Sequence, residues 1–239
     1  MIVGMYLILL VGAYCDHKCN EVPDYVTVPY VYLGIVNALN EGRYALVCVL
    51  LVIVNVIQFD VPLPFIDTIN RFFLQRLSQE ELDTQEAIDD TASEFYKKNN
   101  IHIFIVAIIL YVLTGIFALM IECPSLNKTL ISLVLFAWPF VVELLPTKNQ
   151  SAGVSAIGGA DILALLGLFG LYGLIGGLYA VTVCMVVILI MYLLRRRQGG
   201  FAMLPYMAIG YPIAAWSVYM FAGDVETTLC SAISWLRLF

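Results

Sequence analysis

The chain has 239 residues, of which 62% are hydrophobic and 13% are charged, whereas a soluble domain carries about 45–50% apolar and about 25% charged residues. One soluble core could not bury so many apolar side chains, so lipid must be the solvent for most of the chain. The net charge of −6 argues against nucleic acid as a main partner.

Eight apolar runs predict an all-α fold, a polytopic transmembrane helical bundle of about eight spans. Several runs are shorter than the ~20 residues that a full crossing requires, so the expected range is six to eight spans. The first run has no charged segment before it and no small-x-small cleavage site, which predicts a retained span rather than a signal peptide. The runs are 2–15, 25–38, 45–59, 101–121, 130–145, 162–172, 174–194 and 204–222.

One long polar segment, 60–100, separates a first membrane part (1–59) from a second (101–239). It holds nine acids and four bases, and its apolar residues between 66 and 77 recur at helical spacing. That pattern predicts an amphipathic helix on the membrane surface, and "SQEE" at 78–81 resembles a capping box that opens a second helix. We expect 60–100 to be an acidic, partly helical cytoplasmic insertion.

The distribution of Lys and Arg predicts the orientation. With the N-terminus outside and eight alternating spans, nine of the twelve Lys and Arg fall in inside loops, and the opposite orientation reverses this ratio. We therefore expect a multi-pass protein of the cell membrane with an outer N-terminus. In this orientation the turns around Asp16 and Asp161 both lie on the cytoplasmic side.

The turn "GAYCDHKCNEVPD", 12–24, admits three interpretations. Asp16 could be a solvated loop residue, since charges near span ends are common. Cys15, His17 and Cys19 are possible zinc ligands. However, two cysteines four apart can share a helix face from which His17 points away, and the spacing is neither CxxC nor HExxH. We therefore expect no metal here, with the thiols acting as packing residues, and we consider Asp16 as one of a catalytic pair.

Asp161 opens a later apolar run and could simply cap a helix N-terminus. The small residues before it, Gly158, Gly159 and Ala160, would let another helix or an extended peptide approach the backbone closely. Two aspartates at one membrane face predict an aspartyl dyad, in which the carboxylates cannot easily both ionise and one keeps a proton. The charged acid activates a water and the neutral acid polarises the scissile carbonyl.

These residues give the chain a resemblance to the type IV prepilin peptidase and archaeal preflagellin peptidase family, the GxGD-type membrane aspartyl proteases. That family has an Asp at the end of its first span, followed by an apolar residue, Pro and Asn or Asp. Here Asp16 is followed by Val22, Pro23 and Asp24, and the GxGD position reads GGAD at 158–161. The segment 201–224 is also similar to the last span of archaeal members.

The resemblance implies that Asp16 and Asp161 are catalytic and that no metal or organic cofactor is needed. It implies a pilin- or archaellin-like precursor as the substrate, with a short basic leader cut from a hydrophobic helix at the cytoplasmic border. The acids of 60–100 would attract such a leader, although this segment could equally be a plain solvated loop.

Three features depart from the family. Ala160 replaces a glycine, and Leu163 stands where the family has a lysine, whose role would be absent or supplied by another base such as Lys18. Three apolar runs, rather than the usual one of archaeal members, separate the second span from 158–161. The insertion 60–100 does not map onto the pattern of the family.

A different class of function fits part of the same pattern. In a small transporter or channel component, Asp16, Asp161 and Glu143 would line an ion or substrate path. The spacing of Pro23 and Asp24 after Asp16, combined with the glycine-rich turn before Asp161, favours the peptidase.

The orientation is tested by cysteine labelling of Asp90→Cys and Gln198→Cys on intact cells. Both positions should be unreactive toward an impermeant reagent added outside, because both loops are predicted to be cytoplasmic, and both should react once the cells are permeabilised. Labelling in intact cells would invert the orientation.

Overall fold

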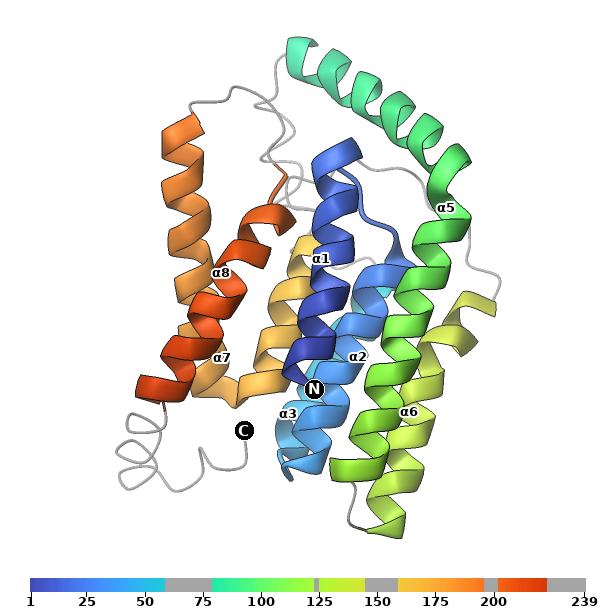
Figure 1. Cartoon of the computed structure of the whole chain (residues 1–239), viewed down its shortest axis with the longest axis vertical. Coiled ribbons are helices and arrows are strands. Elements are labelled where there is room, and N and C mark those ends of the chain that lie inside the picture. Colours follow the sequence, from blue (N-terminus) through green and yellow to red (C-terminus); the bar gives the residue numbers. More distant parts are fainter. Residues whose placement is uncertain (59–78, 123–124, 145–158, 196–201, 223–239) are drawn as a thin grey trace.

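The computed structural model describes residues 1–58, 79–122, 125–144, 159–195 and 202–222, and every regular element in these ranges is a helix. Figure 1 shows these helices gathered into one bundle. The helices are α1 (Ile2–Cys19), α2 (Asp24–Asn40), α3 (Tyr44–Gln58), α5 (Gln79–Glu122), α6 (Leu126–Leu144), α7 (Gly159–Arg195), α8 (Leu204–Ser217) and the π-helix η1 (Val218–Ala222).

The all-α class and the apolar character of the bundle are confirmed. Three helical stretches, Ile2–Cys19, Ala92–Met120 and Ala160–Met191, are long and apolar enough to cross a membrane. Each predicted run coincides with helix. Helix α7 breaks at Gly173, which has a φ of 78°, a left-handed conformation that glycine adopts readily. This break separates the predicted runs 162–172 and 174–194. The count of eight spans stays a prediction.

The polar insertion is only partly described. Residues 59–78, including the predicted amphipathic helix, lie outside the described ranges. From Gln79 the chain forms one continuous helix to Glu122, so the expected boundary between 100 and 101 falls inside α5. Figure 1 shows α5 leaning across one end of the bundle before it turns down beside α1 and α2.

Helix α2 is the centre of the bundle. All of its residues from 26 to 39 are buried, and it packs against α1, α3, α5, α6 and α7. A helix that is apolar on every side is buried on every side. Five helices therefore pack directly on α2, and α8 packs on α1 and α7.

The tightest contact of α2 is with the first half of α7. A methyl group on Gly34 would come 2.8 Å from the carbonyl oxygen of Gly167, and one on Gly170 would collide with the backbone carbonyl group of Gly34. The ring of Tyr30 covers Gly167 in the same way. Small residues allow two membrane helices to bring their backbones together, so these glycines fix how α7 lies along α2.

Polar groups secure the same two helices where α7 breaks. The side-chain amide of Asn37 donates to the carbonyl oxygens of Leu171 at 3.0 Å and Gly170 at 3.4 Å. These carbonyls sit at the end of a helical segment, where intrahelical partners run out. The guanidinium of Arg43, which pairs with Glu41, lies against Gly173. The α2–α7 contact is thus held by glycines in its middle and by Asn37 at its end.

The glycine contact predicts a large effect for Gly170→Ala, because the added methyl meets backbone rather than a flexible side chain. Overpacking of this kind costs about 1–3 kcal/mol, so the midpoint of thermal unfolding in detergent should fall clearly. Gly12→Ala is the matched control, since its methyl would have no neighbour closer than 3.4 Å. Equal midpoints for the two variants would contradict the close approach of α2 and α7.

Candidate active site

Asp16 lies on the buried face of α1. Only 6% of its surface is exposed, and it shares this face with Met5, Leu9 and Gly12, which are also buried. Positions spaced by three and four residues lie above one another on a helix, so the apolar pattern of α1 carries the carboxyl group into the bundle. A buried carboxyl group requires a partner.

The partner is the first turn of α8. The backbone N–H of Leu204 donates to Oδ2 of Asp16 at 2.9 Å. The first amides of a helix lack intrahelical acceptors, and the helix N-terminus attracts negative charge. Asp16 therefore caps α8 from a different helix, and this contact holds the carboxyl group in one orientation.

Asp161 is the third residue of α7 and is half-buried. It opens the helix that packs against both α2 and α8, and the first turn of α8 is the one that binds Asp16. Figure 1 shows the C-terminal end of α1 and the first turn of α7 at the same end of the bundle. The fold thus places two acids from opposite halves of the chain at the same end of the bundle.

The segment after Asp16 forms the turn between α1 and α2. Asn20 ends α1 in a left-handed conformation with φ 53°, and its N–H donates to the carbonyl oxygen of Asp16 at 2.8 Å. Val22 packs beside Gly12. Pro23 is the extended residue before α2, with φ −66° and ψ 146°, and Asp24 is the exposed first residue of that helix. An acid in the first helical turn is favourable, so Val22, Pro23 and Asp24 shape the helix start.

The residues around Asp161 are placed less completely. Gly158 lies outside the described residues, Gly159 begins α7, and Ala160 packs half-buried against the core. Leu163, where the resemblance implies a lysine, is 2% exposed and belongs to the apolar core.

Lys18 does not join the acid pair. It is exposed, and two residues correspond to about 200° of rotation on a helix of 3.6 residues per turn, so Lys18 lies across α1 from Asp16. The expectation that Lys18 replaces the family lysine is therefore not supported, because the helical period separates the two side chains.

The two thiols of the turn pack against α5, and His17 faces away from them. Cys15 and Cys19 are buried while His17 is exposed. The Cys19 thiol donates to the carbonyl oxygen of Cys15 at 3.1 Å and lies 3.5 Å from the hydroxyl of Tyr96, which donates to the carbonyl oxygen of Glu21 at 2.7 Å. Within the described ranges, no three His, Cys, Asp or Glu side chains form a group suited to a metal ion.

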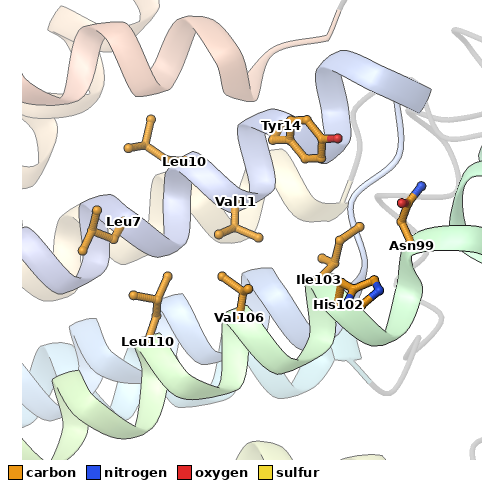
Figure 2. Close-up of a pocket in the computed structure, with 9 residues that line it drawn as sticks. All are labelled: Leu7, Leu10, Val11, Tyr14, Asn99, His102, Ile103, Val106 and Leu110. Carbon is orange, nitrogen blue, oxygen red and sulfur yellow. The ribbon is translucent and has the colours of Figure 1, made fainter.

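A groove of about 460 Å³ runs between α1 and α5, and Figure 2 shows its lining. Its walls are apolar, and Tyr14, Asn99 and His102 add polar groups. Asp16 is nine residues from Leu7 on the groove wall, or about 180° of helix rotation. The groove and the acid pair therefore use opposite faces of α1. The lining residues are Leu7, Leu10, Val11, Tyr14, Asn99, His102, Ile103, Val106 and Leu110.

Comparison with protein-family models, with curated proteins and with solved structures gives no match for this chain. A functional assignment must therefore come from the residues themselves. Two parts of the site were missed at the level of sequence. The Leu204 amide carries no sequence signal, because any residue could supply it. Thr27 and Tyr30, which line a small cavity with Gly12, Ala164 and Leu204, are polar residues three apart in an apolar run, and that spacing was a usable signal.

The packing of the thiols predicts that Cys15→Ser combined with Cys19→Ser leaves most activity of the site intact. Chelators should not inhibit, because we expect both thiols to act as packing residues rather than as metal ligands. The check is an activity assay beside elemental analysis of purified protein. Stoichiometric zinc that disappears in the double variant would overturn the packing role.

Proposed function

We propose that the protein is a membrane aspartyl endopeptidase that removes short basic leader peptides from pilin- or archaellin-like precursors, with Asp16 and Asp161 as the catalytic pair. The observation that carries the proposal is that a buried acid near the end of α1 and a half-buried acid in the first turn of α7 lie at the same end of the helical bundle. Burial of a carboxyl group is expensive, and burying one beside another is a recurrent feature of catalytic sites.

The chemistry needs one ionised and one protonated acid. The ionised carboxylate accepts a proton from water, and the water oxygen attacks the scissile carbonyl carbon. The protonated acid donates its proton to the carbonyl oxygen, and the C–N bond then breaks as the leaving nitrogen takes up a proton. The Leu204 N–H at 2.9 Å from Oδ2 fixes Asp16 for this step, and no metal or organic cofactor takes part.

The surroundings of the pair fit a basic leader. The backbone of 79–91, at the start of α5, lies at the same end of the bundle as the acid pair. This stretch holds six acids and no base, so it adds negative charge near the site and would raise the local concentration of a basic segment. In this proposal that end faces the cytoplasm, where the leader emerges.

The transporter or channel alternative fits the arrangement less well. Transport sites gather their polar groups near the middle of the membrane, whereas Asp16 and Asp161 belong to the helix turns at one end of the bundle. The Glu143 side chain lies outside the described residues. The end position favours chemistry at a membrane border.

Asp16→Asn and Asp161→Asn should each abolish cleavage of a co-expressed precursor, scored by leader removal on a gel. An amide neither accepts nor returns the proton of the mechanism. The protein should still fold and insert, because in Asp16→Asn the side-chain carbonyl oxygen of the new amide can accept the Leu204 N–H as the carboxylate does.

Asp16→Ala separates the chemical role of Asp16 from its role as a cap. It should be inactive and also less stable by about 0.5–2 kcal/mol, the usual cost of losing a helix cap. Cleavage that survives in either Asn variant would refute the aspartyl mechanism.

The shared proton predicts a bell-shaped dependence of kcat on pH. Activity should fall on the alkaline side as the pair loses its proton, and on the acid side as the second carboxylate gains one. The two limbs belong to the pair rather than to either residue. A profile that is flat across both limbs would be inconsistent with a dyad.

A further inference from the structure

The groove between α1 and α5 lies on the face of α1 opposite Asp16, and the proposed chemistry does not use it. Its volume of about 460 Å³ falls within the range of about 300–1,000 Å³ that is usual for ligand sites. Leu7, Leu10 and Val106 in its walls remain exposed. In a membrane such an apolar surface meets lipid.

The polar groups of the groove gather at one of its ends. Figure 2 shows Tyr14, Asn99 and His102 at one end, with Leu7 and Leu110 at the other. The polar end is the end at which α1 finishes. The groove is therefore polar at the border of the bundle and apolar toward its middle.

The length of the groove matches one leaflet of a bilayer. From Asn99 to Leu110 its wall follows eleven residues of α5, which is about 16 Å of helix. The hydrocarbon core of a bilayer is about 30 Å thick. A membrane-spanning helix would need a groove of the full thickness, whereas the acyl chain of a lipid needs only one leaflet.

Basic side chains border the polar end. Lys18 is exposed and lies on the groove side of α1, because the eleven residues from Leu7 correspond to about three full helical turns. Its side chain leans toward the helix N-terminus, back over Tyr14. On α5 the exposed Lys98 lies one turn before His102. Ammonium and imidazole N–H groups both donate to phosphate oxygens.

The nearby acids do not cancel this positive charge. Glu94 lies a further turn beyond Lys98 and offsets one charge at most. Asp90 is eight residues from Lys98, about 12 Å of helix, which exceeds the Debye length of about 8 Å at physiological ionic strength. Glu21 and Asp24 precede and open α2, which packs on another side of α5.

We propose that the groove between α1 and α5 binds one anionic phospholipid, with an acyl chain between the two helices and the headgroup phosphate on Lys18, Lys98 and His102. Basic residues at a membrane border attract anionic lipids, and the same residues would repel the basic leader of a precursor. The length of one leaflet also favours a lipid over a helix. This site does not depend on the proposed cleavage activity.

The occupant is tested by photolabelling of the purified full-length protein in detergent. The probe is phosphatidylglycerol with a photoreactive group at the end of one acyl chain, and labelled peptides are mapped by mass spectrometry. Label should fall on 7–14 and 99–110, and unlabelled phosphatidylglycerol should displace it at severalfold lower concentration than phosphatidylcholine with the same chains. Label spread evenly over the bundle, or equal displacement by the two lipids, would overturn the site.

The headgroup contact is tested by removing single charges. Lys18→Gln and Lys98→Gln should each weaken displacement by phosphatidylglycerol roughly fivefold, the usual effect of one base near anionic lipid, and should leave displacement by phosphatidylcholine unchanged. Lys97→Gln is the matched control, since Lys97 is also exposed but is turned about 100° further from the groove. An equal loss in this control would overturn the headgroup contact.

The acyl-chain contact is tested by filling the groove. Val106→Trp should abolish most labelling, whereas Ile105→Trp should not, because Ile105 is equally exposed, at 48% against 47%, but does not line the groove. Unchanged labelling in Val106→Trp would overturn the contact. Displacement of the label by a membrane-spanning leucine–alanine peptide at lower concentration than by phosphatidylglycerol would assign the groove to a helix and overturn the lipid site.

Discussion

The close approach of α2 and α7 is the constraint on which the rest of the structure depends. At Gly34, Gly167 and Gly170 the two helices leave no room for a methyl group. In lipid, helices gain little from burying apolar surface against one another, so packing at this distance supplies the attraction. It also fixes the relative height of the helices, and through that height it sets where Asp161 stands at the end of the bundle.

The bond between Asp16 and the Leu204 amide links the two remaining helices of the site. It ties the end of α1 to the start of α8, which in turn packs on α7. A carboxyl group buried on α1 without a partner would be unfavourable. Unpaired backbone N–H groups at the start of α8 would also be unfavourable where water cannot reach them. Each group satisfies the other. A structural role for Asp16 and the proposed catalytic role are therefore compatible, since a fixed carboxyl group is what catalysis requires.

Much of the fold follows from the apolar periodicity of the sequence. Each predicted run became helix, and the gap at Gly173 became the break in α7. The continuity of α5 was missed because polarity changes near residue 100 while helix propensity does not, and no proline lies between 79 and 122. Local composition indicates whether a segment faces lipid or water. It indicates where a helix ends only if a helix-breaking or capping residue is present.

Short sequence motifs identified Asp16 and Asp161, but they did not predict which residues of other helices surround the two acids. Helical spacing separates Asp16 from Lys18 and from His17, and this could be worked out from the sequence. Which helix would cover the buried face of α1 could not, because any neighbour with a free N-terminus would satisfy the carboxyl group equally well. The placement of α8 there is a property of the whole bundle, and so is the burial of Thr27 and Tyr30.

The central claim is that Asp16 and Asp161 face each other, and cross-linking tests it without an activity assay. In a variant whose native cysteines are replaced by serine, Asp16→Cys and Asp161→Cys are combined, and a protease site is placed in the 60–78 segment. A short bifunctional maleimide should hold the two fragments together after proteolysis. The control pairs Lys18→Cys with Asp161→Cys and should fall apart, because Lys18 lies across α1. Equal or stronger linkage in the control, or none in the acid pair, would contradict the account.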